Sequence, residues 1–168
     1  GYYFDEILAE SVLGRIYKEI GELPKAEKAY LRVYKIATGA TDEKLGSYIY
    51  IAQKGLAEVY TSMEKFDQAR LYLDDYIKNR PYENTPIEEL VNNLLLAKIA
   101  FAEKDYGMAK EAIFKAEEGM MQLDKEIILF RYIDVLNLKA KISAQEGDFE
   151  AAYLIQSKAR EEYKIYQN

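Results

Sequence analysis

Four short stretches of the chain share one order of residue sizes. They read GELPKAE at 21–27, EKFDQAR at 64–70, KDYGMAK at 104–110 and GDFEAAY at 147–153, and each has an alanine three positions after a leucine or an aromatic residue. The separations between these alanines are 43, 40 and 43 residues, for Ala26, Ala69, Ala109 and Ala152. A period of this length is typical of stacked supersecondary units, so the spacing predicts a repeat architecture.

The residues around each stretch indicate that the repeated unit is a pair of helices. Apolar residues recur at helical spacing before and after each turn, for example Leu90, Leu94, Ala97 and Phe101 before the third turn. An alanine allows two antiparallel helices to approach closely, and the larger residue before it wedges the start of the second helix. We therefore expect eight helices, at 5–20, 24–38, 42–62, 66–79, 86–103, 106–121, 124–145 and 149–167.

The predicted fold class is all-α, an α-α superhelix of four helical hairpins in a single domain over residues 1–168. The hairpins are expected at 5–38, 42–79, 86–121 and 124–167. A helix start is predicted at Thr85, because a capping residue is followed by Pro86 at the first helical position and by Glu88 three residues after the cap. The chain begins without methionine, which indicates a piece of a longer protein.

Composition excludes several kinds of partner. The net charge is −6 and no cluster of Lys and Arg forms a basic stripe, so we do not expect nucleic acid to bind. No apolar run approaches the length of about 18 residues that a membrane span requires. Cysteine is absent, which excludes disulfide bonds and leaves the compartment open; we favour the cytoplasm over the periplasm.

An enzyme is not expected. Histidine and cysteine are both absent, so no Ser–His or Cys–His pair can form. Adjacent acids such as Glu88–Glu89 point about 100° apart on a helix and cannot face one another as an acid/base pair. No phosphate-binding loop, EF-hand pattern or zinc spacing occurs, so neither a cofactor nor a metal is predicted.

The chain resembles a tandem array of tetratricopeptide repeats. The residues that match the family pattern are Leu13, Gly14, Tyr17, Ala26 and Tyr30; Leu56, Ala57, Tyr60, Ala69 and Pro81; Leu96, Ala97, Ala109 and Ala116; and Ala140, Ala152 and Ala159. The usual repeat is about 34 residues long, so the longer period here implies longer first helices. Arrays with stretched repeats are similar to the repeat domains of bacterial regulatory proteins, including sensor kinases and transcription regulators.

The resemblance implies that the first helix of each unit lines a concave face. The family's spacing of i, i+3, i+7 and i+10 assigns to that face, as residues that contact a ligand, Arg15, Lys18, Ile51, Lys54, Glu58, Leu94, Lys98, Phe101, Asn137 and Lys141. The same spacing also places Asp134 there. Five cations against two acids favour an acidic peptide or chain terminus as the ligand. The alternative is an ordinary solvated helix face.

Sixteen tyrosines are an unusual number for a chain of 168 residues. Four of them fit packing positions of the repeat, namely Tyr17, Tyr30, Tyr60 and Tyr106. A role in binding stays open for five others, namely Tyr48, Tyr50, Tyr132, Tyr163 and Tyr166.

The sequence thus favours a scaffold that binds proteins or peptides, as the interaction or sensing domain of a larger regulatory protein. Two alternatives stay open. One is a homo-oligomerisation module, such as a homodimer, and the other is a sensor of a small molecule or signal peptide, which would need a closed pocket.

Overall fold

The structure, a computed structural model, describes residues 2–81, 83 and 85–167, and all regular structure in these residues is helical. The chain divides into two compact units, Gly1–Tyr82 and Glu83–Asn168. The division lies between residues 82 and 83, within what the sequence predicts as one domain. Each unit is described by itself.

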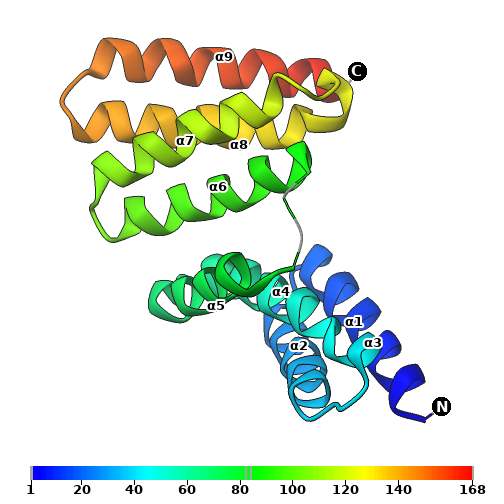
Figure 1. Ribbon diagram of the computed structural model, residues 1–168. Helices are drawn as coiled ribbons and strands as arrows, with labels where there is room; N and C mark the ends of the chain where they lie inside the picture. Colours follow the sequence, from blue (N-terminus) through cyan, green and yellow to red (C-terminus); the bar gives the residue numbers. More distant parts are fainter. Residues whose placement is uncertain (1, 82, 84, 168) are drawn as a thin grey trace. The chain divides into compact units, whose positions relative to one another are not determined.

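The first unit consists of two helical hairpins with a short helix between them. Its elements are α1 (Tyr2–Glu19), α2 (Leu23–Thr38), α3 (Glu43–Gly46), α4 (Tyr48–Ser62) and α5 (Phe66–Asn79). Helices α1 and α2 form the first hairpin and α4 and α5 the second, and α4 packs mainly on α2 and less on α1 (Figure 1). A buried cluster joins the first three of these long helices through Ile7, Val33, Ala37 and Ala52.

The second unit also consists of two helical hairpins. Its elements are α6 (Pro86–Ala102), α7 (Tyr106–Met120), α8 (Lys125–Gln145) and α9 (Phe149–Gln167). Helix α8 packs on α7 and on α6, so the third long helix contacts both helices of the preceding hairpin, as in the first unit. Leu90, Ala109, Ile113 and Val135 belong to a core that α6, α7 and α8 share.

The expected all-α class and the pairing of neighbouring helices are confirmed, with one difference at 42–62. There the structure has two helices, α3 and α4, where the sequence predicts one. Gly46 and Ser47 lie at the junction, and a Gly/Ser pair is a common place for a helix to kink. The Ser47 hydroxyl donates to the Lys44 carbonyl at 2.7 Å, a local bond that competes with the regular ladder.

All four hairpin turns have the same hydrogen-bond pattern. In the first, the Glu22 N–H donates to the Tyr17 carbonyl, and Gly21 has a φ of 78°, which makes a Schellman ending. The other three turns repeat both features, with positive φ at Glu64, Lys104 and Gly147. The positive-φ residues are separated along the chain by the same intervals as the four alanines. The predicted register of the four units therefore holds for the backbone hydrogen bonds of the turns.

The packing role expected of the alanines holds for three units. Ala26, Ala69 and Ala109 are fully buried, and the larger residues before them are partly buried. In the fourth unit, however, Ala152 is only partly buried and Phe149 is 72% exposed. Helix α9 packs mainly on α8, and the side of α9 that carries Phe149, Tyr153 and Leu154 is exposed.

The helix start predicted at Thr85 is present in full. The Glu88 N–H donates to the Thr85 hydroxyl oxygen, and the Thr85 N–H donates to a Glu88 carboxylate oxygen at 3.0 Å. This reciprocal pair satisfies two amide groups that the start of a helix otherwise leaves without partners.

Candidate functional site

The predicted concave-face residues of the first unit lie on α1 and α4. Lys18 donates to Glu58 and the two side chains form a salt bridge that joins these helices. The Lys54 ammonium lies 5.9 Å from the centre of the Tyr76 ring, within the range of a cation–π contact. Arg15 and Ile51 are exposed.

The predicted residues of the second unit have more internal roles. Lys98 donates to Asp134 at 2.9 Å and so joins α6 to α8, and the Asn137 side-chain oxygen accepts from Gln156 at 3.0 Å. Leu94 is only 2% exposed and belongs to the core, so this side chain is not available to a ligand.

The last two predicted residues of this unit differ from each other. Phe101 packs against the core with its ring centre 5.6 Å from that of Tyr106, whereas Lys141 is exposed. Phe101 is partly buried in this arrangement.

These pairings neutralise two of the five cations predicted for the first helices. The two acids assigned to the face, Glu58 and Asp134, each neutralise one of its lysines. Each of these salt bridges also connects successive first helices within one unit. The structure therefore favours a mainly structural role for Lys18 and Lys98, and it leaves Arg15, Lys54 and Lys141 as the cations that no acid of this set pairs with.

Tyrosines assigned to packing are buried or partly buried. Tyr30 lies between two glycines: a Cβ atom added to Gly14 of α1 would be 2.9 Å from its ring, and one added to Gly55 of α4 would be 2.5 Å away. Burial raises the pKa of Tyr30 to about 12, and the nearby Glu58 carboxylate acts in the same direction. Burial raises the pKa of Tyr60 as well.

The tyrosines for which binding stayed open have mixed surroundings. Tyr48 packs edge-on against Phe4 with ring centres 6.3 Å apart, and the Lys158 ammonium lies 5.4 Å from the centre of the Tyr132 ring. Tyr50 is partly buried and Tyr163 is exposed. The side chain of Tyr166 lies outside the described residues.

A groove between α1 and α2 is a concave surface of the first unit. It has a volume of about 780 Å³ and is open to solvent, and we call it the α1/α2 groove. The residues that line it are Glu10, Leu13, Tyr17, Lys25, Lys28, Ala29, Leu31, Arg32 and Lys35. A smaller hollow of about 360 Å³ shares Arg32 and Lys35 with it and continues toward Ala40.

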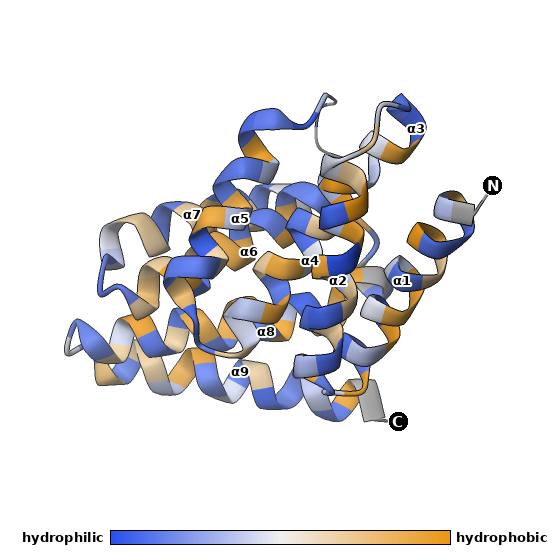
Figure 2. Cartoon of the chain, turned by 90° about the horizontal axis from the view of Figure 1, so that it is seen from below, coloured by the Kyte–Doolittle hydropathy of each residue, from blue (hydrophilic) through white to orange (hydrophobic). Residues whose placement is uncertain are grey.

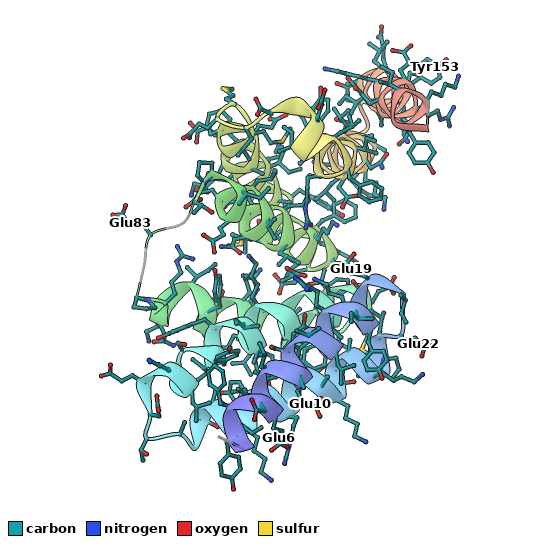
Figure 3. All side chains as sticks on the ribbon, turned by 90° about the vertical axis from the view of Figure 1, so that its right-hand side faces the viewer. Glu6, Glu10, Glu19, Glu22, Glu83 and Tyr153 are labelled. Carbon is teal, nitrogen blue, oxygen red and sulfur yellow. The ribbon has the colours of Figure 1, made fainter. Side chains whose placement is uncertain are left out.

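One edge of this groove is basic. Lys25, Lys28, Arg32 and Lys35 recur along one side of α2, and we call them the basic row. Lys25 is 3.3 Å from Glu22, and the Arg32 Nε donates to Glu6 at 2.7 Å. The two acids come from α1 and from the turn after it (Figure 3).

Two members of the basic row have no acid partner. Among the described residues, Lys28 and Lys35 make no salt bridge. The lining of the groove therefore holds four cations against one acid, Glu10, on a chain whose net charge is −6.

Sequence reasoning did not identify the α1/α2 groove, because the family resemblance directed attention to the first helix of each unit. A signal was present in the second helix of the first unit. Lysine or arginine occurs at 25, 28, 32 and 35, a spacing that places four cations on one side of a helix.

The second unit has its own groove, of about 630 Å³, formed by α7, α8 and α9. Its lining is apolar at Phe114, Met121 and Ile128, with Glu118 and Lys158 at the edge. Lys158 has an elevated pKa because of its contact with the Tyr132 hydroxyl. This surface could hold an apolar side chain, and its charged lining is mainly acidic, with Glu117, Glu118 and Glu162 against Lys158, the opposite of the α1/α2 groove.

No group of three or more His, Cys, Asp or Glu side chains in the described part of the chain could hold a metal ion. None of the described helices is both long and apolar enough to cross a membrane. Comparison of the chain with protein-family models, with curated proteins and with solved structures finds no match.

Proposed function

We propose that this chain is a non-catalytic scaffold that binds a protein or peptide, and that it serves as an interaction or sensing domain of a larger regulatory protein. The observation that carries the proposal is the α1/α2 groove, which combines an apolar floor with a basic edge. Leu13, Tyr17 and Ala29 supply the floor. A polypeptide segment with apolar and acidic side chains fits such a surface.

The regularity of the units supports a helical-repeat scaffold of the tetratricopeptide kind. Four hairpins with the same turn geometry follow one another, and in each unit the third long helix packs on both helices before it. Packed helical hairpins hold a surface rigidly, so that binding costs little conformational entropy.

Selection from a displayed library of random peptides tests this function. We expect the chain to enrich a family of related peptides, and we expect the double variant Leu13→Asp with Leu31→Asp to lose that enrichment. Both leucines are partly exposed, at 38% and 39%, so the fold does not depend on their burial.

A control variant separates binding at the groove from binding elsewhere. Leu71→Asp with Leu154→Asp changes two exposed leucines on α5 and α9 by the same chemistry. The proposal fails if the chain enriches no peptides, or if both double variants enrich the same peptides as the original chain.

Homo-oligomerisation is a second candidate, because one side of α9 is apolar and uncovered. Phe149, Tyr153 and Leu154 are all exposed there; Tyr153 is labelled in Figure 3. Sedimentation velocity over a hundredfold range of concentration tests this candidate. A species that stays monomeric throughout excludes it.

A further inference from the structure

The common turn geometry allows residues of α1 and α4 to be compared position by position. The turn after α1 and the turn after α4 make the same backbone hydrogen bonds, 43 residues apart in the sequence. The Ile20 N–H donates to the Ile16 carbonyl, and the Met63 N–H donates to the Val59 carbonyl. Ala9, Val12 and Ile16 therefore occupy in α1 the positions that Ala52, Gly55 and Val59 occupy in α4.

On α4 these positions form the contact with α2. Ala52 packs with Val33 and Ala37 of α2. A Cβ atom on Gly55 would collide with the ring of Tyr30, which is also on α2. Val59 is fully buried. A helix that lies against this side of α4 is thus part of how the unit folds.

On α1 the same positions are apolar and exposed. Ile16 is 46% exposed and Val12 38%, and Ala9 is exposed as well; we call these three residues the open face of α1. Hydrophobic segments recur along α1 in Figure 2. The open face has the composition of a helix-packing surface, but within the described residues no helix covers it.

Helix α2 supplies the second side of this surface. Ala29 of the α1/α2 groove corresponds to Tyr72 of α5, and the Tyr72 ring contacts Tyr34 of α2 with ring centres 5.7 Å apart. By the same geometry, a helix on the open face of α1 would also approach Ala29. It would then lie beside the basic row, which flanks Ala29.

We propose that the open face of α1 and the basic row together bind an amphipathic helix of another protein, with its apolar side on α1 and an acidic side toward α2. The inference rests on the proposed function and names its partner class. Charge selects this occupant, because Lys28 and Lys35 are uncompensated and carboxylates complement them. The exposed side of α9 carries Glu150 and Glu161 together with Arg160 and Lys164, so a second copy stacked through α9 supplies a flank of mixed charge and not an acidic one.

Two displayed libraries of amphipathic helices test the proposal. They share one randomised apolar stripe, and they differ only in a flank that carries glutamates in one library and lysines in the other. The chain is expected to enrich members of the glutamate library, and an enriched peptide is expected to bind at least about tenfold more tightly than its lysine counterpart in fluorescence anisotropy.

Three variants assign the binding to the surface. Ile16→Lys is expected to weaken binding of the enriched peptide by more than about tenfold, because it places a charge in the apolar contact. Lys28→Glu with Lys35→Glu is expected to weaken binding of this peptide about tenfold and to reduce the salt dependence of the affinity. Lys44→Glu with Lys78→Glu is the control, since it changes the net charge equally at two exposed lysines elsewhere in the unit.

Several results would overturn the inference. One is equal enrichment of both libraries, or of neither, and another is binding that survives Ile16→Lys or the Lys28/Lys35 reversal. A dimer that Ile16→Lys dissociates and that the acidic peptide does not displace would make a second copy the occupant. If random peptides are enriched but ignore all three variants, the scaffold function stands and this site is wrong.

Discussion

At the scale of single residues, the four turns place different residue types at the one position that has a positive φ. The second residue after each first helix has a positive φ. It is a glycine at Gly21 and Gly147 but Glu64 and Lys104 in the other two turns. A residue with a Cβ atom pays about 1 kcal/mol or more for this conformation, which glycine adopts freely. The second and third turns therefore carry strain that the first and fourth do not.

Glu64→Gly is expected to raise the free energy of unfolding by about 0.5 to 1 kcal/mol, because the relief of strain exceeds the added entropy of the unfolded chain. Chemical denaturation followed by circular dichroism measures the change. Gly21→Ala is the converse variant and is expected to destabilise by a similar amount, although the space around Gly21 is open. A Glu64→Gly chain that is less stable than the original would contradict the strain argument.

At the scale of helices, Tyr30 sets how closely α1, α2 and α4 approach. Its ring is 4% exposed and lies against Gly14 on one side and Gly55 on the other. Gly14 and Gly55 have no side chains, so the Tyr30 ring fills the space between these helices that larger side chains would otherwise occupy. The ring cannot move away from one glycine without approaching the other.

Gly55→Ala is therefore expected to destabilise the chain by about 1 to 3 kcal/mol, despite the higher helix propensity of alanine. Thermal and urea unfolding measure the loss. Gly46→Ala is the matched control, because no atom lies within 4 Å of its added Cβ, and it is expected to be neutral or slightly stabilising. Equal effects of the two substitutions would show that the Tyr30 contact does not limit the approach of these helices.

Local pattern predicts the helices well because their determinants lie close together in sequence. The spacing of the alanines, the capping pair Thr85 and Glu88 and the apolar stripes each act within a few turns of helix, and the corresponding elements are present. The junction at Gly46 and Ser47 was missed, because long apolar periodicity continues across it. Two small residues outweighed that periodicity.

The candidate site was harder to predict, because charge pairing depends on contacts between helices. Nothing near Lys98 in the sequence indicates that Asp134 neutralises it, since the two residues meet only when α6 and α8 pack. Leu94 shows a similar limit: the family spacing assigns it to a surface, whereas its position in the core depends on three helices. The basic row of α2 was visible as a pattern but had no role until its groove was formed.

At the scale of the whole molecule, the apolar cores argue for two folding units. One buried cluster comes from α1, α2 and α4, and a larger one comes from α6, α7 and α8. The segment between α5 and α6 contains Pro81 and precedes the capping box at Thr85, so one helix ends and the next begins with local signals of its own. Each unit thus contains the contacts and the helix ends that it needs.

Residues 1–82 and 83–168, expressed separately, are each expected to be helical and to unfold cooperatively, because every core cluster described above lies within one of them. Circular dichroism during thermal unfolding measures this, with dispersion of amide signals in NMR as a second criterion. Residues 1–39 and 83–122 are the control fragments. Each keeps one hairpin and loses the helix that completes its core, α4 or α8, so both are expected to be poorly folded. If 83–168 lacks a cooperative transition by itself while the full chain has one, the single domain that the sequence predicts is the better description.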